Sequence, residues 1–150
     1  LQALGSKLTY SSPEEHDKMM AVVQVLVHFN TIVMGETLRD SGISILDTLK
    51  FTSPIYKLEL SLIGRLFAQD PTLYAEILFQ NPYSKNMREL FLKTANKFSC
   101  LLDREDRDAF KEHFVFGKEY FNYFAEESMQ LSDRIIEEVV TNRLLINDHH

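Results

Sequence analysis

Residues 52–71, TSPIYKLELSLIGRLFAQDP, decide the fold class. Ser53-Pro54 predicts a helix start, because serine caps the free N–H groups of a first turn and proline suits its first position. Asp70-Pro71 repeats the signal, so one helix ends there and another begins. Between the two signals apolar side chains lie almost all round the helix: Ile55, Tyr56, Leu58, Leu60, Leu62, Ile63, Leu66 and Phe67. Such a helix is expected to be buried on most of its faces.

Arg65 is the exception in this helix. At 100° per residue, Leu58, Leu62 and Arg65 fall within about 60° of one another, so the arginine shares an apolar stripe. An arginine cannot lose its proton to lower the cost of apolar surroundings, and it therefore needs an anion. Periodicity leaves two interpretations open. The anion is either an acidic side chain, such as Glu59, Asp70 or one on another helix, or a bound ligand.

The rest of the chain predicts an all-α fold, a bundle of about six or seven helices. Long patterns of 3.6-residue period run through it, with only five glycines and four prolines in 150 residues. Ser12, Pro13 and Glu15 form a capping box at the start of the first helix. The helices are expected over residues 13–38, 44–50 after Gly42, 54–70, 71–80, 83–102, 104–128 and 129–146. Their apolar faces exceed what one monomer covers, which favours a dimer built through the helices.

Length, charge and cysteine content narrow the class of protein. A chain of 150 residues suits one domain. The net charge of −6 leaves no basic excess for a nucleic-acid surface. Cys100, the single cysteine, cannot form an internal disulfide and is expected to be a buried thiol. No run of 18 apolar residues and no signal peptide is present, so we expect no membrane contact and a cytoplasmic protein.

Few residues suggest chemistry of their own. The sequence contains no GxGxxG, no GxxxxGK[ST] and no HExxH motif. The acidic run around His16, residues 14–17, is better explained as helix capping than as a metal site, because consecutive helical residues point in different directions. His28 interrupts VLVHFN, where a satisfied core histidine is the simplest interpretation. Lys57 by itself suggests a surface lysine whose stem lies along the helix.

Two long segments resemble a known family. EEHDKMMAVVQVLVHF (14–29) and SPIYKLELSLIGRLFAQDPTLYAEI (53–77) closely resemble the C-terminal helical domain of prephenate dehydrogenases. They are most similar to the enterobacterial type, often fused to chorismate mutase as the T-protein. The resemblance is strong over residues 12–80 and has fewer motifs from 81 to 150.

The resemblance also implies a domain organisation. LQALGSKLTY, with a short strand at residues 7–10, resembles the last helix-to-strand passage of the family's NAD-binding domain, and the chain begins at Leu1 rather than Met. We therefore expect residues 1–11 to be the tail of that domain. Residues 12–150 are expected to form the helical dimerisation and substrate-binding domain of a longer protein.

The family resemblance implies an NAD-dependent oxidative decarboxylation of prephenate to 4-hydroxyphenylpyruvate, towards tyrosine. In this family the N-terminal domain holds NAD and supplies the catalytic histidine, while the helical domains interlock into a homodimer. We therefore expect no catalytic, cofactor-binding or metal-binding residue in this chain, and no activity from the fragment alone.

The family also implies roles for individual residues. Arg65 matches the arginine that binds a carboxylate of prephenate, a task for which a planar guanidinium is suited. His28 matches a histidine near the substrate that is linked to inhibition by tyrosine. Lys57 stands where close relatives have arginine, and Tyr74 occupies an aromatic position that either walls the pocket or belongs to the core. Leu62 replaces an acid that gates the site in some relatives, so that gate is not expected here.

Two other functions remain open at this stage: a non-catalytic helical dimerisation module, and a regulatory module that senses tyrosine without turnover. Arg65 on an apolar stripe favours the enzyme, because a module that only dimerises gains nothing from a desolvated cation there. The sequence does not decide between NAD and NADP, between prephenate and arogenate, or whether a chorismate mutase segment precedes the NAD domain.

Overall fold

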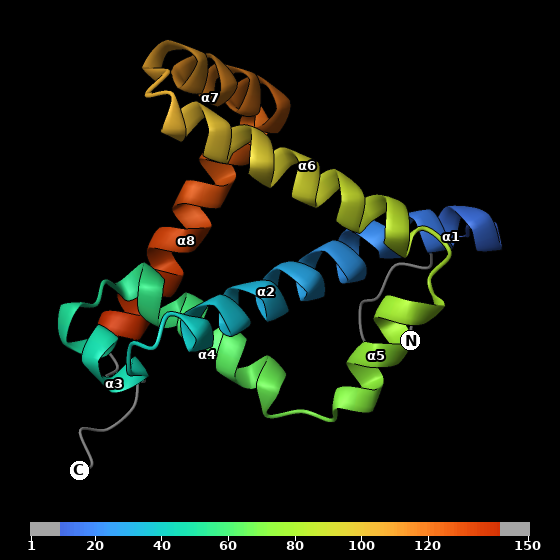
Figure 1. Cartoon of the computed structure of the whole chain (residues 1–150), viewed down its shortest axis with the longest axis horizontal. Helices are drawn as coiled ribbons and strands as arrows, with labels where there is room; N and C mark the ends of the chain where they lie inside the picture. The colour runs from blue at the N-terminus through green and yellow to red at the C-terminus, as the bar shows by residue number, and fades with distance from the viewer. Residues whose placement is uncertain (1–9, 142–150) are drawn as a thin grey trace.

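The all-α prediction is confirmed over residues 10–141, the part of the chain that the computed structural model describes (Figure 1). The strand expected at residues 7–10 lies outside this part except for Tyr10. Seven helices are present within it when Pro13–Asp40 is counted as one. They are Pro13–Asp40 (α1, η2 and α2), Ile45–Thr48 (α3, extended by η3, Leu49–Phe51), Pro54–Phe67 (α4), Pro71–Gln80 (α5), Ser84–Asp103 (α6), Arg107–Phe121 (α7) and Tyr123–Thr141 (α8).

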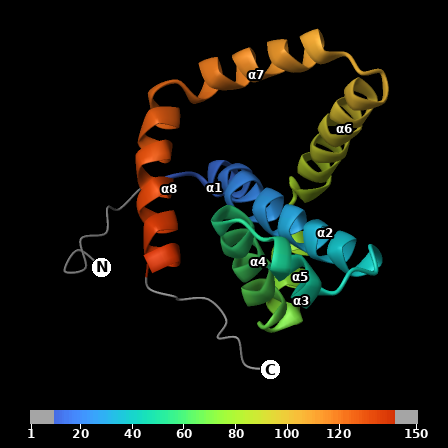
Figure 2. The same cartoon turned by 90° about the vertical axis from the view of Figure 1, so that its left-hand side faces the viewer.

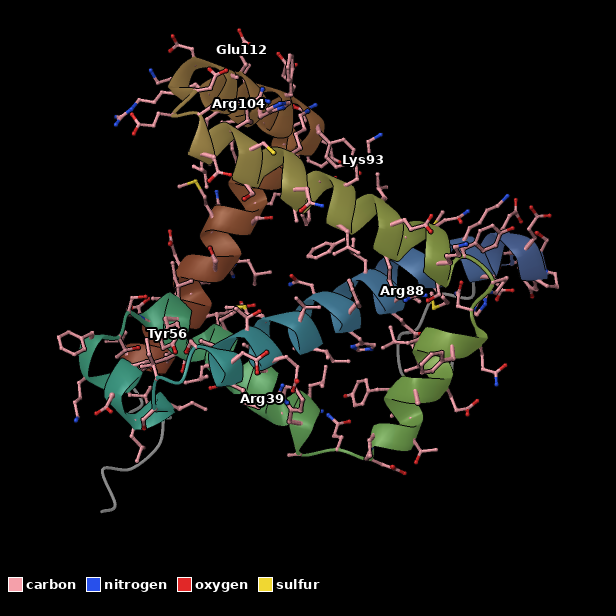
Figure 3. All side chains as sticks on the ribbon, viewed as in Figure 1. Arg39, Tyr56, Arg88, Lys93, Arg104 and Glu112 are labelled. Atoms are coloured by element: carbon pink, nitrogen blue, oxygen red, sulfur yellow. The ribbon has the colours of Figure 1, made fainter. Side chains whose placement is uncertain are left out.

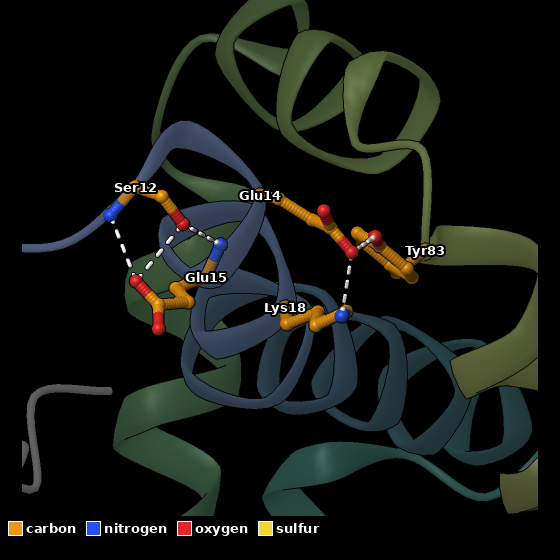
Figure 4. A network of polar contacts seen from close by, with 5 residues as sticks. All are labelled: Ser12, Glu14, Glu15, Lys18 and Tyr83. Atoms are coloured by element: carbon orange, nitrogen blue, oxygen red, sulfur yellow. Dashed lines mark hydrogen bonds and ion pairs between the residues drawn. The ribbon is translucent and has the colours of Figure 1, made fainter.

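The long first helix forms the spine of the fold. It consists of α1 (Pro13–Met20), a π-helical segment η2 (Ala21–Leu26) and α2 (Val27–Asp40). Its start is the predicted capping box: the Ser12 hydroxyl accepts from the Glu15 N–H at 3.2 Å, and the Ser12 N–H donates to Glu15 Oε2 at 2.8 Å (Figure 4). The chain leaves the helix through Gly42, whose φ of +70° suits glycine.

Helix α4 crosses α2 at a point of close approach. A Cβ built on Gly35 would collide with the Phe67 ring and would lie 3.0 Å from Cγ2 of Ile63. A side chain at position 35 would therefore require the Phe67 ring to move. In Figure 1 the two helices run in opposite directions, α2 towards α3 and α4 away from it.

A polar network ties the turn between α5 and α6 to the first helix. Asn81 Nδ2 donates to the Asp17 carbonyl at 2.8 Å, and Asn81 Oδ1 accepts from the Tyr83 N–H at 2.8 Å. Glu14 pairs with Lys18 at 2.7 Å and accepts from the Tyr83 hydroxyl at 3.2 Å (Figure 4). Two of these contacts, Asn81 with Asp17 and Tyr83 with Glu14, join residues more than 60 positions apart, so they hold the start of α6 against α1.

We predict that Asn81→Ala lowers the free energy of unfolding by about 1–2 kcal/mol, because it removes both partly buried hydrogen bonds. Asn81→Asp keeps the acceptor for Tyr83 but places a carboxylate oxygen against the Asp17 carbonyl, so it should cost at least as much. Urea unfolding of the three proteins measures the difference. Equal stability of the parent protein and Asn81→Ala would contradict the prediction.

Helices α6, α7 and α8 form an arm that extends from the other helices. Figure 2 shows them as three sides of an open frame, with the end of α8 returning towards α4. Phe98 of α6 joins α7 through edge contacts with Phe110 (6.1 Å between ring centroids) and a tilted contact with His113 (5.5 Å). Phe110, Phe114, Phe121 and Phe124 follow one another at near-helical spacing, but Phe114, Phe121 and Phe124 are exposed, so this aromatic stripe packs against another helix only in part.

Two helix boundaries differ from the prediction. A single helix over 104–128 is wrong: α7 starts at Arg107, where the Asp106 carboxylate caps the Ala109 N–H at 3.1 Å, and Glu105 turns the chain with a φ of +53°. Helix α7 then ends at Asn122, whose φ is +46°, and α8 begins at Tyr123 rather than at Met129. Asparagine tolerates positive φ better than most residues, a weak signal inside a helical pattern.

Two expectations about exposure also change. Cys100 is exposed, not buried, because it lies on the outer side of α6, away from Phe98. The helix Pro13–Asp40 is long and apolar enough to meet the length and composition test for a membrane span, which the sequence analysis missed. The core helix of a soluble protein passes the same test, and this helix is packed by α4, α5 and α6.

Candidate functional site

Helix α4 has one buried and one open side. Leu60, Ile63 and Leu66 are buried, at 5–8% exposure. The stripe of Leu58, Leu62 and Arg65 lies on the opposite side, where Leu62 is 51% exposed and Arg65 is exposed. The expected burial on most faces is therefore wrong for the part of the chain that the structure describes, since Leu62 and Arg65 remain exposed there. The shared stripe itself is present as predicted.

The Arg65 guanidinium has no hydrogen bond or ion pair with any residue between 10 and 141. Of the expected partners, Asp70 instead caps α5. Its Oδ1 accepts from the Thr72 N–H at 2.9 Å, and this backbone hydrogen bond lowers the pKa of the carboxyl group. Glu59 makes no ion pair in the described part of the chain either. The ion pair considered for Arg65 is therefore not present among residues 10–141, and its binding of a ligand stays a prediction.

His28 and Tyr74 are brought into contact by α2 and α5. Their ring centroids lie 5.0 Å apart at an interplanar angle of 83°, an edge-to-face pair of the preferred geometry. Tyr74 is buried and His28 is half-buried. Burial lowers the pKa of the His28 imidazole, which favours the neutral ring at pH 7. A neutral histidine carries one donor and one acceptor, so it suits a hydroxyl or carbonyl rather than a second anion.

The lowered pKa of His28 predicts a pH effect on stability. Because the unfolded chain binds the proton more tightly than the folded one, stability is highest above the unfolded pKa of about 6.5 and falls as pH drops through that value. We expect the melting temperature to fall between pH 7.5 and 5.5, and His28→Gln to reduce this fall. Melting curves at five pH values in both proteins test it; identical profiles would contradict the assignment to His28.

The four predicted site residues do not form one cluster. Arg65 is level with Gly35 at the crossing of α2 and α4, and His28 lies seven residues away along α2, about 10 Å. Lys57 lies two turns before Arg65 on α4, about 12 Å away and towards α3. His28 and Tyr74 are thus together, whereas Arg65 lies on the side of α4 that faces away from α2, and Lys57 is further along α4.

A second cation escaped the sequence analysis. Arg88 lies on the face of α6 that carries Ser84 and Phe91, close to where α6 passes the first helix (Figure 3). Its Nε is buried and has no hydrogen-bond partner in the described residues. The signal was available: like Arg65, Arg88 stands within a helical apolar stripe, between Met87 and Phe91.

Residues 12–116 match the family model described as "Prephenate dehydrogenase, dimerization domain". The chain belongs to this family. The resemblance seen in the sequence is thereby confirmed. The match includes α6 and most of α7 and stops before α8.

Proteins of this family from three organisms match most of the chain. A probable arogenate/prephenate dehydrogenase of Methanocaldococcus jannaschii is 35% identical over 136 residues, which is 91% of this chain and 30% of that protein. The T-protein of Haemophilus influenzae is 32% identical over 138 residues, 92% of this chain and 37% of that protein. The T-protein of Enterobacter agglomerans is 35% identical over 126 residues, 84% and 34% respectively. The chain spans about a third of the length of these relatives.

Proposed function

We propose that the protein to which this chain belongs is an NAD-dependent prephenate dehydrogenase of the cytoplasm. It would convert prephenate to 4-hydroxyphenylpyruvate, and this chain would supply substrate-carboxylate binding and dimerisation. Arg65 carries the proposal: a cation on an apolar stripe, without a counter-ion among the described residues, in a chain of the prephenate dehydrogenase family.

Arg65 would bind one carboxylate of prephenate, in a bidentate manner that fixes its orientation. His28, as a neutral imidazole against Tyr74, would contact a neutral polar group of the substrate or of tyrosine as an inhibitor. Lys57, about 80° round α4 from Arg65, would add positive potential on the approach rather than a direct contact. All of these residues would position the substrate and none would form or break a bond, so we expect the fragment alone to be inactive.

We expect NAD to bind outside the residues described here. No β-strand followed by a glycine-rich turn occurs within 10–141, so no phosphate-binding turn of the NAD type is present there. We assign the cofactor and the catalytic histidine to the preceding domain, and no residue of this chain to hydride transfer.

The test is turnover by the full-length protein. Prephenate and NAD should give NADH and carbon dioxide in equal amounts, and residues 12–150 alone should give neither. If the full-length protein produces no NADH from prephenate or arogenate, the enzymatic proposal fails. The interaction module then becomes the better interpretation, and tyrosine binding measured by calorimetry would identify its sensing form.

We further infer a homodimer from the exposed apolar surface. The chain exposes 12666 Å², whereas a compact monomer of its mass exposes about 7,900 Å². Large apolar side chains stand open along the arm: Phe114, Tyr120, Phe121, Phe124 and Met129. Exposed surface of this kind marks a protein interface, and the family of dimerisation domains makes a second copy the expected partner.

Phe121→Glu with Phe124→Glu should convert the dimer into monomers, because it places two charges in the proposed interface. Light scattering on a sizing column should show the mass fall by half. Phe79 lies on α5, outside the arm, and is more exposed than Phe121 or Phe124, so Phe79→Glu should leave the dimer intact. A monomeric parent protein would refute the dimer without affecting the enzymatic proposal.

A further inference from the structure

The π-helical segment η2 lies in the middle of the long helix, one turn before His28. In a π-helix the N–H of each residue bonds the carbonyl five residues back, so such a segment takes in one residue more than an α-helix. Everything after it is turned by about 100° relative to an uninterrupted α-helix. Segments of this kind often occur near functional sites.

Ala21 and Val25 show which way η2 faces. They are the only buried residues of η2, at 1% and 0% exposure, and η2 packs mainly against α6. Val22 and Val23, in contrast, are 46% and 59% exposed on the other side. The direction of Ala21 can therefore serve as the reference for the α6 side of the helix.

An uninterrupted α-helix would put the wrong side chain on the α6 side. His28 follows Ala21 by seven residues, or 700°, so it would lie within about 20° of Ala21 and face α6. Phe29 would lie about 80° away. The shift of about 100° reverses this: Phe29 comes to within about 20° of Ala21, and His28 turns about 120° away.

The ring contacts agree with the shifted arrangement. Phe29 meets Phe91 of α6 with centroids 5.6 Å apart, edge to face. His28 meets Tyr74 of α5 at 5.0 Å. Without the extra residue of η2, His28 would take the place of Phe29 and would be desolvated against Phe91. Tyr74 would then lose its ring contact with His28.

We propose that η2 sets the rotational position of the residues that follow it. Its extra residue directs His28 to Tyr74 on α5 and Phe29 to Phe91 on α6, which regular α-helical spacing would not do. The segment is thus a positioning element for His28. The placement itself does not depend on the proposed function, and only the significance of His28 for prephenate binding rests on it.

The proposal makes an unusual prediction about deletions. Removing Val23, an exposed residue of η2, should let the helix continue as a regular α-helix, with His28 and Phe29 facing as before. Removing Asn30, an exposed residue of the regular helix α2, should instead turn Gly35 by about 100° away from Ile63 and Phe67. One deletion is therefore tolerated and the other is not.

The experiment compares the two deletions in the full-length protein, with Val23→Ala as the control for loss of the side chain alone. The ring protons of His28, observed by histidine-selective NMR, should carry a ring-current shift from Tyr74, identified by its loss in Tyr74→Leu. We expect the Val23 deletion to keep this shift and to melt within about 5 °C of the parent, and the Asn30 deletion to lose more than about 10 °C or not to fold.

Failure of the Val23 deletion to fold, or loss of the His28 shift in it, would overturn the proposal. So would a Val23 deletion as destabilised as the Asn30 deletion. Neither readout needs turnover, so a protein inactive on prephenate would refute the proposed function while this comparison still decides the role of η2.

Discussion

Arg65→Ala in the full-length protein should lower kcat/KM for prephenate about 100-fold or more, equivalent to about 3 kcal/mol of lost transition-state stabilisation. The guanidinium stands without an ion pair among the described residues, and its removal leaves a substrate carboxylate unpaired. Steady-state NADH formation at several prephenate concentrations measures the change.

Stability separates the two roles considered for Arg65. Because Arg65 is exposed and its stripe lies opposite the buried side of α4, Arg65→Ala should melt close to the parent temperature. A structural ion pair would give the reverse result, with a lower melting temperature and an unchanged kcat/KM. Arg65→Lys should lie between parent and alanine variant, because lysine keeps the charge and loses the bidentate geometry.

Arg39 provides the matched control. It is an exposed arginine near the end of α2 that is already paired with Glu36 and Asp40 (Figure 3). Arg39→Ala removes the same charge from a neighbouring helix and should leave kcat/KM within about twofold of the parent. Equal losses in Arg39→Ala and Arg65→Ala would indicate a general effect of net charge and would contradict a specific carboxylate site.

Local signals in the sequence predicted most of the helix boundaries. Ser12, Ser53 and Asp70 each cap a helix with the expected side-chain hydrogen bond, since capping depends on residues within three positions. The boundary at Asn122 was missed because neither proline nor glycine marks it. The π-helical segment was also missed, because hydrophobic periodicity assumes 3.6 residues per turn throughout the helix.

Burial was harder to predict than secondary structure. The pattern of α4 indicated apolar surface on most sides, yet within the described residues only Leu60, Ile63 and Leu66 of this helix are buried. The apolar pattern of a helix indicates which side chains are buried in the full-length, assembled protein. The surface that buries them can come from this chain or from another. The open side of α4 and the arm of α6, α7 and α8 are therefore where a further domain or a second copy is expected.

The candidate site was accessible from the sequence only in part. Arg65 could be selected from physical chemistry alone, because its charge conflicts with its stripe. His28 and Tyr74 came from the family resemblance, and no spacing rule indicated their contact across 46 positions. Their roles towards prephenate and tyrosine stay predictions, as does that of Lys57.

Gly35→Ala is expected to have the largest effect on stability, since it acts at the crossing of α2 and α4. Alanine normally improves a helix by about 1 kcal/mol over glycine. Here the added methyl group would collide with the Phe67 ring and lie 3.0 Å from Ile63, which is buried and has little room to move. Overpacking of this kind costs about 1–3 kcal/mol, so alanine should destabilise and Gly35→Val should do so further.

Gly64→Ala is the control, because a Cβ at Gly64 meets nothing within 4 Å. Replacing glycine by alanine within a helix stabilises it by about 1 kcal/mol. For a protein of this size, that gain should raise the melting temperature by about 2–4 °C. Gly35→Ala should lower it, so that the two alanine variants differ in sign. If both raise the melting temperature, the Phe67 ring, half exposed at 50%, swings aside at little cost, and the crossing of α2 and α4 does not require glycine. Opposite signs would show instead that backbone approach at this one point limits how α4, and with it Arg65, is held against the first helix.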